Sequence, residues 1–167
     1  DGKAYLYFVR FTNGNVIWCA ELKDNLKEIK EETLTQCIEA VEPWEMVFGK
    51  VAEGPSILKR DGLYYLLYSA NDFRSQDYAV GYATSDSPFG PWKKNSKNPL
   101  LHRVDELVGT GHGAPFADKD GNLRYIFHAH KSQTEVNQRN SYIVDMSLSG
   151  KDQVSIGGGL IRPAVVK

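Results

Sequence analysis

The chain of 167 residues carries 20 Lys and Arg against 21 Asp and Glu, a formal net charge of -1. This balance offers neither the basic surface that binds nucleic acid nor a cationic face for anionic lipid, and no apolar run reaches the ~20 residues of a membrane-spanning helix. Hydrophobic residues make up 41% and charged residues 25%, as in folded globular domains. Nine Tyr, seven Phe, three Trp and 15 Gly favour a β-rich protein with many tight turns.

The N-terminal part of the chain is predicted to form a β-hairpin and an outer strand. An Asp-Gly pair opens an aromatic-rich strand over 1–11, and a second strand follows over 15–22. Asp-Gly is a favoured turn pair, and the residues after it suit a strand. The charged stretch 24–31 is interpreted as a loop or a single turn, and residues 32–39 as the outer strand.

This layout recurs twice along the chain. Further Asp-Gly pairs begin at Asp61 and Asp120, and Pro55 and Pro115 take equivalent places in the strands before them. The second unit also carries a proline-rich loop at its edge, over 88–99. The strands predicted for the two units are 54–60, 61–71 and 78–85, then 114–119, 120–130 and 141–148.

A repeat of about 60 residues with three or four short strands is typical of β-propeller blades, so the predicted fold is all-β. The blade units are about 1–52, 53–107 and 108–150, and 151–167 begins the segment that closes the propeller. Closed propellers have about 4–8 blades. We therefore expect the chain to supply under three blades, roughly half of a propeller. The alternative is a β-sandwich whose hairpins look alike by chance.

Three segments resemble glycoside hydrolase family 43: EGPSILKRDGLYYLLYSAN (53–71), YAVGYATSDSPFGPWKK (78–94) and GTGHGAPFADKDGNLRYIFHAH (109–130). The resemblance spans roughly residues 1–148. It implies a five-bladed β-propeller enzyme that acts on arabinose-, xylose- or galactose-containing polysaccharides. Five blades of this length would need roughly 300 residues.

Inverting glycoside hydrolysis needs an acid that protonates the leaving oxygen and a carboxylate base that activates water, about 6.5–9.5 Å apart. The resemblance implies that Glu53, in the E-G-P segment, is the general acid. It also implies that the general base and a third Asp, which tunes the pKa of the acid, precede residue 1. Asp1, Asp61 and Asp120 are interpreted as turn residues and not as replacements for them.

Further residues are expected to bind substrate around the acid. The resemblance implies that His112, in G-T-G-H-G, lies near the propeller axis, in contact with substrate or, through water, with a structural calcium ion. Calcium prefers oxygen ligands, so direct coordination by this histidine is not expected. The resemblance also implies that Arg139 reaches the sugar from the pocket rim. Trp44 and Phe73 lie in predicted loops, where an exposed ring can stack on a sugar. No cofactor is required.

Two other pairs of residues have structural interpretations. His128 and His130 alternate on one strand face without the additional carboxylate or Cys of a zinc site, so we expect a hydrogen-bonded pair near the blade top. Cys19 and Cys37 fall on adjacent strands of the first unit, and free thiols are favoured over a disulfide.

Three classes of function remain open: a glycosidase, a non-catalytic carbohydrate-binding propeller and a structural repeat domain. The E-G-P and G-T-G-H-G segments on corresponding strands favour a glycosidase for arabinose- or xylose-containing polysaccharides or oligosaccharides. Its expected partners are that substrate and the N-terminal half of the propeller, without nucleic acid or membrane, and an extracytoplasmic location is favoured. The 167-residue chain alone is expected to be inactive and to expose two bare blade faces.

Overall fold

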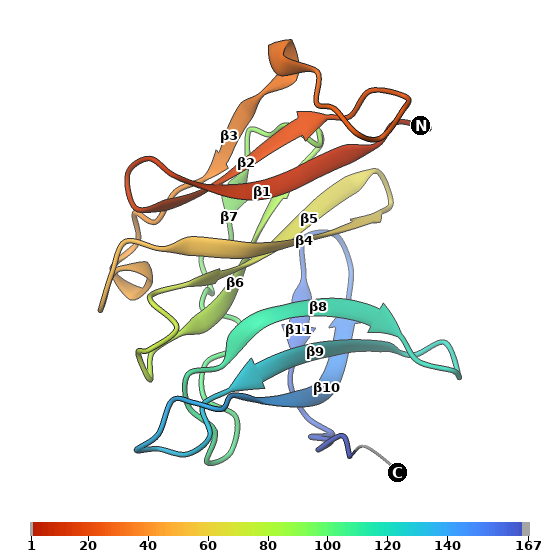
Figure 1. The fold of residues 1–167 in the computed structure, drawn as a ribbon. Coiled ribbons are helices and arrows are strands. Elements are labelled where there is room, and N and C mark those ends of the chain that lie inside the picture. Colours follow the sequence, from red (N-terminus) through yellow and green to blue (C-terminus); the bar gives the residue numbers. More distant parts are fainter. Residues whose placement is uncertain (1, 165–167) are drawn as a thin grey trace.

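Three antiparallel sheets follow one another along the chain in the computed structural model, which describes residues 2–164 (Figure 1). The first sheet contains β1 (Tyr5–Phe11), β2 (Asn15–Glu21) and β3 (Thr35–Ile38). The second contains β4 (Ala52–Arg60), β5 (Leu63–Ala70), β6 (Ala79–Ser85) and β7 (Lys93–Lys94). The third contains β8 (Gly111–Ala117), β9 (Leu123–Ala129), β10 (Asn140–Leu148) and β11 (Val154–Ile156). Two short 3-10 helices, η1 (Glu31–Thr33) and η2 (Pro43–Glu45), flank β3.

Each sheet is built in chain order, so its first strand is an edge strand. The edge strand β4 lies between β8 of the third sheet and β1 of the first, as Figure 1 shows, and it also contacts β2. This arrangement confirms the expected repeat of antiparallel sheets, and it is not the two-layer sandwich considered as the alternative. The first strands differ at their ends from the predicted 54–60 and 114–119, because β4 begins at Ala52 and β8 spans Gly111–Ala117. Asp1 and residues 165–167, where the first Asp-Gly pair and the last predicted strand partly fall, lie outside the described residues.

The Asp-Gly pairs turn the chain in two different ways. Asp61 and Gly62 have φ values of 51° and 80° and join β4 to β5 with no other residue between them, the geometry of a type I′ hairpin turn. The turn from β8 to β9 is longer, and its Asp118 carboxylate accepts hydrogen bonds from the backbone N–H groups of Asp120 and Asn122, each at 2.9 Å. Both pairs are turn residues, as predicted.

The strand β5 is the centre of the packing because all of its residues are buried. Side chains alternate along a strand, so Leu63, Tyr65 and Leu67 join a core shared with the third sheet, which includes Tyr125 and Phe127. Leu66, Tyr68 and Ala70 join a second core with Ile17 and Ile38 of the first sheet. The apolar run of this segment therefore reflects a strand covered on both faces.

Two predicted segments differ in the structure. The predicted outer strand over 32–39 is shorter, because η1 occupies its first residues and β3 spans only Thr35–Ile38. Within the predicted closing segment, Val154–Ile156 forms β11, which pairs with β10 and completes the third sheet. This pairing buries Ile156 in the core between the second and third sheets.

Two further features concern the cysteines and the helices. Cys19 and Cys37 are free, as expected. No helix within residues 2–164 is long and apolar enough to cross a membrane.

Candidate functional site

Side chains from all three sheets meet at the carboxylate of Glu53, which lies near the start of β4 and is 20% exposed. The Tyr78 hydroxyl, just before β6, donates a hydrogen bond to Oε1 at 2.8 Å. The Asn15 amide, at the start of β2, donates to Oε2 at 3.1 Å. His112 Nδ1, from β8, lies 3.8 Å from Oε1. The structure therefore brings Glu53 and His112 together, and it adds Asn15 and Tyr78, neither of which was identified from the sequence.

Matching bulges in β4 and β8 bring these residues together. The strand register shifts between Glu53 and Ser56, and again between Gly111 and Ala114. Gly54 and His112 directly follow the last paired residues before the two bulges, and both have positive φ values, 57° and 51°. His112 is therefore equivalent to Gly54, one position beyond Glu53. A positive φ is uncommon for a residue other than glycine, and it is found at tight turns as well as at functional sites.

The bulges correct the equivalence of the two prolines. Pro55 lies inside the bulge of β4, whereas Pro115 lies beyond the bulge of β8 and pairs with Tyr125. The sequence could not show this. A bulge shifts the register of one strand against its partner, but the residue types along the strand give no sign of the shift.

The glycines of the G-T-G-H-G segment make room for three rings. A Cβ on Gly109 would collide with the ring of His130, and one on Gly111 would collide with the ring of Tyr78. A Cβ on Gly113 would lie 2.5 Å from a ring carbon of Tyr125. Real Cβ atoms do not approach heavy atoms this closely, so the alternating glycines let aromatic side chains pack directly against the backbone of 109–113.

The rim of the site contains His128, Arg139 and Phe73. The His112 and His128 rings stack with their centroids 5.6 Å apart, and Arg139 Nη1 lies 3.3 Å from Nδ1 of His128. The Arg139 guanidinium also lies over the Phe73 ring, 4.8 Å from its centroid. His130 is buried, and its Nε2 donates to the carbonyl oxygen of Phe73 at 2.8 Å. His128 thus belongs to the site, whereas His130 holds the loop that carries Phe73.

Burial, together with the charges of Arg139 and His112, lowers the pKa of His128 to about 4. Its ring is therefore neutral at pH 7 and accepts the hydrogen bond that Arg139 donates. Burial acts to raise the pKa of Glu53, but His112, Tyr78 and Asn15 stabilise the carboxylate and leave the pKa below its usual value. The contacts within this chain thus favour the charged form of the predicted general acid.

Trp44 is separate from these contacts. It lies in η2, where its ring packs against Gly81 and stands 6.0 Å, centroid to centroid, from the ring of Tyr68. It also lines a small cavity with Asp77 and His102. The predicted loop is the 3-10 helix η2 at this residue, and the half-buried ring serves the packing between the first two sheets.

The residues around Glu53 do not form a calcium cage. Within residues 2–164, no group of three or more His, Cys, Asp or Glu side chains is arranged to hold a metal ion. Calcium prefers several oxygen ligands, whereas His112 and His128 offer ring nitrogens and Arg139 adds a positive charge. The water-mediated calcium contact of His112 stays a prediction, and no chemical step is derived through a metal.

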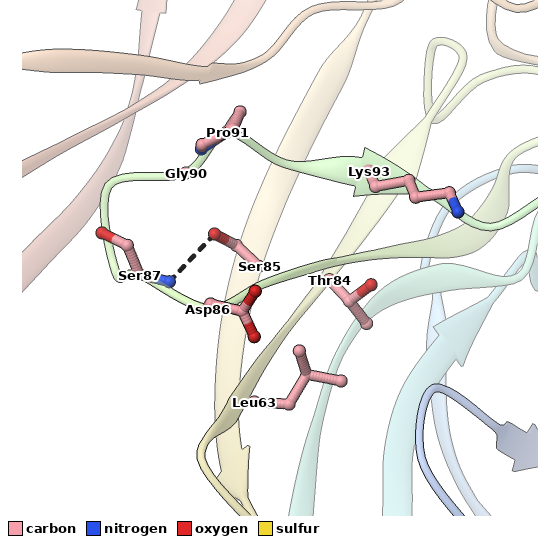
Figure 2. Close-up of a pocket in the computed structure, with 8 residues that line it drawn as sticks. All are labelled: Leu63, Thr84, Ser85, Asp86, Ser87, Gly90, Pro91 and Lys93. Carbon is pink, nitrogen blue, oxygen red and sulfur yellow. Dashed lines mark hydrogen bonds between the residues drawn. The ribbon is translucent and has the colours of Figure 1, made fainter.

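A cavity of about 380 Å³ lies at the other end of the second sheet (Figure 2). Leu63, at the beginning of β5, contributes to it, whereas Glu53 pairs with Ser69 near the end of that strand. None of the predicted site residues lines this cavity. Its lining consists of Leu63, Thr84, Ser85, Asp86, Ser87, Gly90, Pro91 and Lys93.

Known proteins share both the sequence and the fold of this chain. Residues 1–151 match the profile of glycosyl hydrolases family 43. The crystal structure of an endo-1,4-beta-xylanase from Bacteroides thetaiotaomicron is 59% identical, with a TM-score of 0.97, over 100% of this chain and 58% of that chain.

Two curated relatives are more distant in sequence. A beta-D-galactofuranosidase from Aspergillus niger is 29% identical over 128 residues, 77% of this chain and 34% of its own length. An extracellular exo-alpha-(1->5)-L-arabinofuranosidase from Streptomyces chartreusis is 35% identical over 94 residues, 52% of this chain and 28% of its own length. The chain thus spans about a third of the curated relatives it matches.

Proposed function

Because the chain belongs to glycosyl hydrolases family 43, we propose that this protein is a glycosidase that hydrolyses arabinose- or xylose-containing plant polysaccharides or oligosaccharides with inversion. Its three sheets match about half of the five-bladed propeller of that family. The observation that carries the proposal is the carboxylate of Glu53, which side chains of all three sheets surround. The substrate class is supported by the xylanase and arabinofuranosidase among the similar proteins.

Glu53 is proposed as the general acid. A general acid must be protonated when substrate binds, yet Tyr78, Asn15 and His112 favour its charged form. A carboxylate near an acid raises the pKa of that acid. The second and third carboxylates, the general base and the Asp that tunes the pKa, are therefore proposed to come from outside residues 1–167. In support, none of the three side chains that contact Glu53 is acidic.

Three residues around Glu53 are proposed to bind the sugar: His112, Phe73 and Arg139. His112 has 53% of its side chain exposed beside Glu53, so it can donate to or accept from a hydroxyl group. Phe73 is 37% exposed and offers an apolar ring, while Arg139 over that ring supplies donors. Trp44 is not included, because its ring packs between sheets. A secreted location is proposed from the extracellular relative.

The test is hydrolysis by the full-length protein of nitrophenyl α-L-arabinofuranoside, β-D-xyloside and β-D-galactofuranoside, together with xylo- and arabino-oligosaccharides. We expect turnover of the arabinosyl or xylosyl substrates, and NMR of the first product should show the anomer opposite to that of the substrate. Retained configuration would overturn the inverting mechanism. Binding of the oligosaccharides without turnover of any substrate would favour the non-catalytic carbohydrate-binding propeller instead.

The polypeptide of residues 1–167 alone is expected to hydrolyse none of these substrates, because the proposed base lies elsewhere. It should also associate with itself. Leu6 and Phe11 of the first sheet are exposed, as are Ile126 and Ile161 at the third. Light scattering and the same hydrolysis assays test both statements. A monodisperse monomer would contradict the expected association, and turnover would show that the base lies within these residues.

A further inference from the structure

Tyr78 is a buried residue whose hydroxyl contacts Glu53, the proposed general acid. It has no exposed surface and directly precedes β6. Its ring occupies the space that Gly111 leaves open, because any Cβ at that glycine would collide with the ring. The backbone of the third sheet thus fixes where the Tyr78 hydroxyl points.

The two donors on Glu53 differ in what they can do. The Asn15 amide presents its NH₂ group to Oε2 and would have to turn over to accept, whereas the oxygen of a phenol both donates and accepts in place. The Tyr78 hydroxyl lies 2.8 Å from Oε1 and 3.4 Å from Nδ1 of His112. It can therefore keep its bond to Glu53 in either protonation state, as donor to the carboxylate or as acceptor from the acid.

We propose that Tyr78 is the positioning residue of the general acid: its hydroxyl orients the Glu53 carboxyl group and stabilises the carboxylate left after the proton has gone to the leaving group. This inference rests on the proposed function, because it assigns Glu53 the acid role. Tyr78 is not expected to contact the substrate, since it is fully buried.

The electrostatics agree with this role. Tyr78 is among the groups that lower the pKa of Glu53, and burial together with the adjacent carboxylate raises the pKa of Tyr78, so the phenol keeps its proton. The other titratable or charged groups that act on this pair are His112, His128 and Arg139. The tyrosine hydroxyl differs from all three in donating a hydrogen bond directly to Oε1, at 2.8 Å.

The test is Tyr78→Phe in the full-length protein, which removes the hydroxyl and keeps the ring. For substrates with poor leaving groups we expect kcat to fall about tenfold or more, with little change in KM. Activated nitrophenyl glycosides should be affected less, because they need less protonation. The alkaline limb of the pH profile should move to higher pH, since the lost hydrogen bond stabilised the charged acid.

Tyr82→Phe is the matched control, because Tyr82 lies in β6 and its hydroxyl bonds to the carbonyl oxygen of Asp152, away from Glu53. It should leave the pH limb and the leaving-group dependence unchanged. An unshifted limb in Tyr78→Phe, with the wild type active, would overturn the positioning role and leave the proposed function intact. An inactive wild type would instead contradict the proposed function.

Site-specific replacement of Tyr78 by 3-fluorotyrosine keeps the test decisive if the Phe variant does not fold. The fluorinated phenol is a stronger hydrogen-bond donor, so the alkaline limb should move in the opposite direction, to lower pH. A limb that stays in place, or moves to higher pH, would contradict the inference.

Discussion

Glu53→Gln in the full-length protein is expected to lower kcat for unactivated xylo- or arabino-oligosaccharides by about 10²–10⁴-fold, the range that general acid catalysis contributes. Glutamine has nearly the shape of glutamate but cannot deliver a proton. Its amide oxygen can still accept the bond from Tyr78, and the Asn15 amide can turn its oxygen toward the new NH₂ group. The fold should therefore survive, and activated aryl glycosides should retain part of their turnover.

Glu39→Gln is the matched control for that loss. Glu39 is comparably buried, with 25% of its side chain exposed, and its carboxylate bonds to Lys50 at 2.6 Å rather than to the site. Unchanged thermal unfolding in both variants, with the loss of activity confined to Glu53→Gln, would assign the effect to chemistry. Near-normal hydrolysis of a poor leaving group by Glu53→Gln would remove Glu53 from the acid role.

The fold was largely predictable because local patterns and packing agree. Asp61-Gly62 forms the hairpin turn that its type predicts, and the apolar run after it becomes β5, which is buried on both faces. The meeting of Glu53 with His112 followed from their places on corresponding strands, since equivalent strands of neighbouring blades lie side by side. These features depend on residues close in sequence or on the repeat itself.

The other contacts of Glu53 were not predictable in the same way. Asn15 and Tyr78 approach it from 38 and 25 residues away, and each has an ordinary reading as a strand or core residue. Nothing near Tyr78 in the sequence indicates that its hydroxyl faces a carboxylate. One signal was available: three alternating glycines in 109–113 leave space against a strand, and large rings must fill it.

Trp44 differs from Asn15 and Tyr78, because the sequence indicated it for the site and the structure places it elsewhere. Its predicted position in a loop suggested an exposed ring for sugar stacking. In the structure the ring packs on Gly81, and the backbone carbonyl oxygen of Trp44 accepts a hydrogen bond from the side-chain amide of Asn71. A predicted loop position therefore did not determine exposure, because the neighbouring Glu45 is buried and holds this segment in the interior. The contribution of Glu45 to stability can be tested separately.

Glu45 is completely buried in η2 and forms the centre of a hydrogen-bonded cluster. Lys94 Nζ of β7 lies 2.6 Å from Oε2, which also accepts bonds from the backbone N–H groups of Val41 and Glu42. The Tyr68 hydroxyl donates to Oε1 at 2.5 Å. These bonds tie the connection between the first two sheets to the outer strand of the second.

Lys94→Met is expected to lower the free energy of unfolding by about 3–5 kcal/mol, because it leaves the buried charge of Glu45 without its counterion. Lys23→Met is the matched control: its ammonium group also lies 2.6 Å from a carboxylate, that of Glu28, but both side chains are more than half exposed. An exposed pair contributes at most about 1 kcal/mol. Urea unfolding of the full-length variants measures the difference, and equal losses in the two would contradict the role of burial. Adding Glu45→Gln to Lys94→Met should recover stability, since it removes the unpaired charge. The amide oxygen can still accept from the Val41 and Glu42 N–H groups, and the NH₂ group can donate to the Tyr68 hydroxyl oxygen.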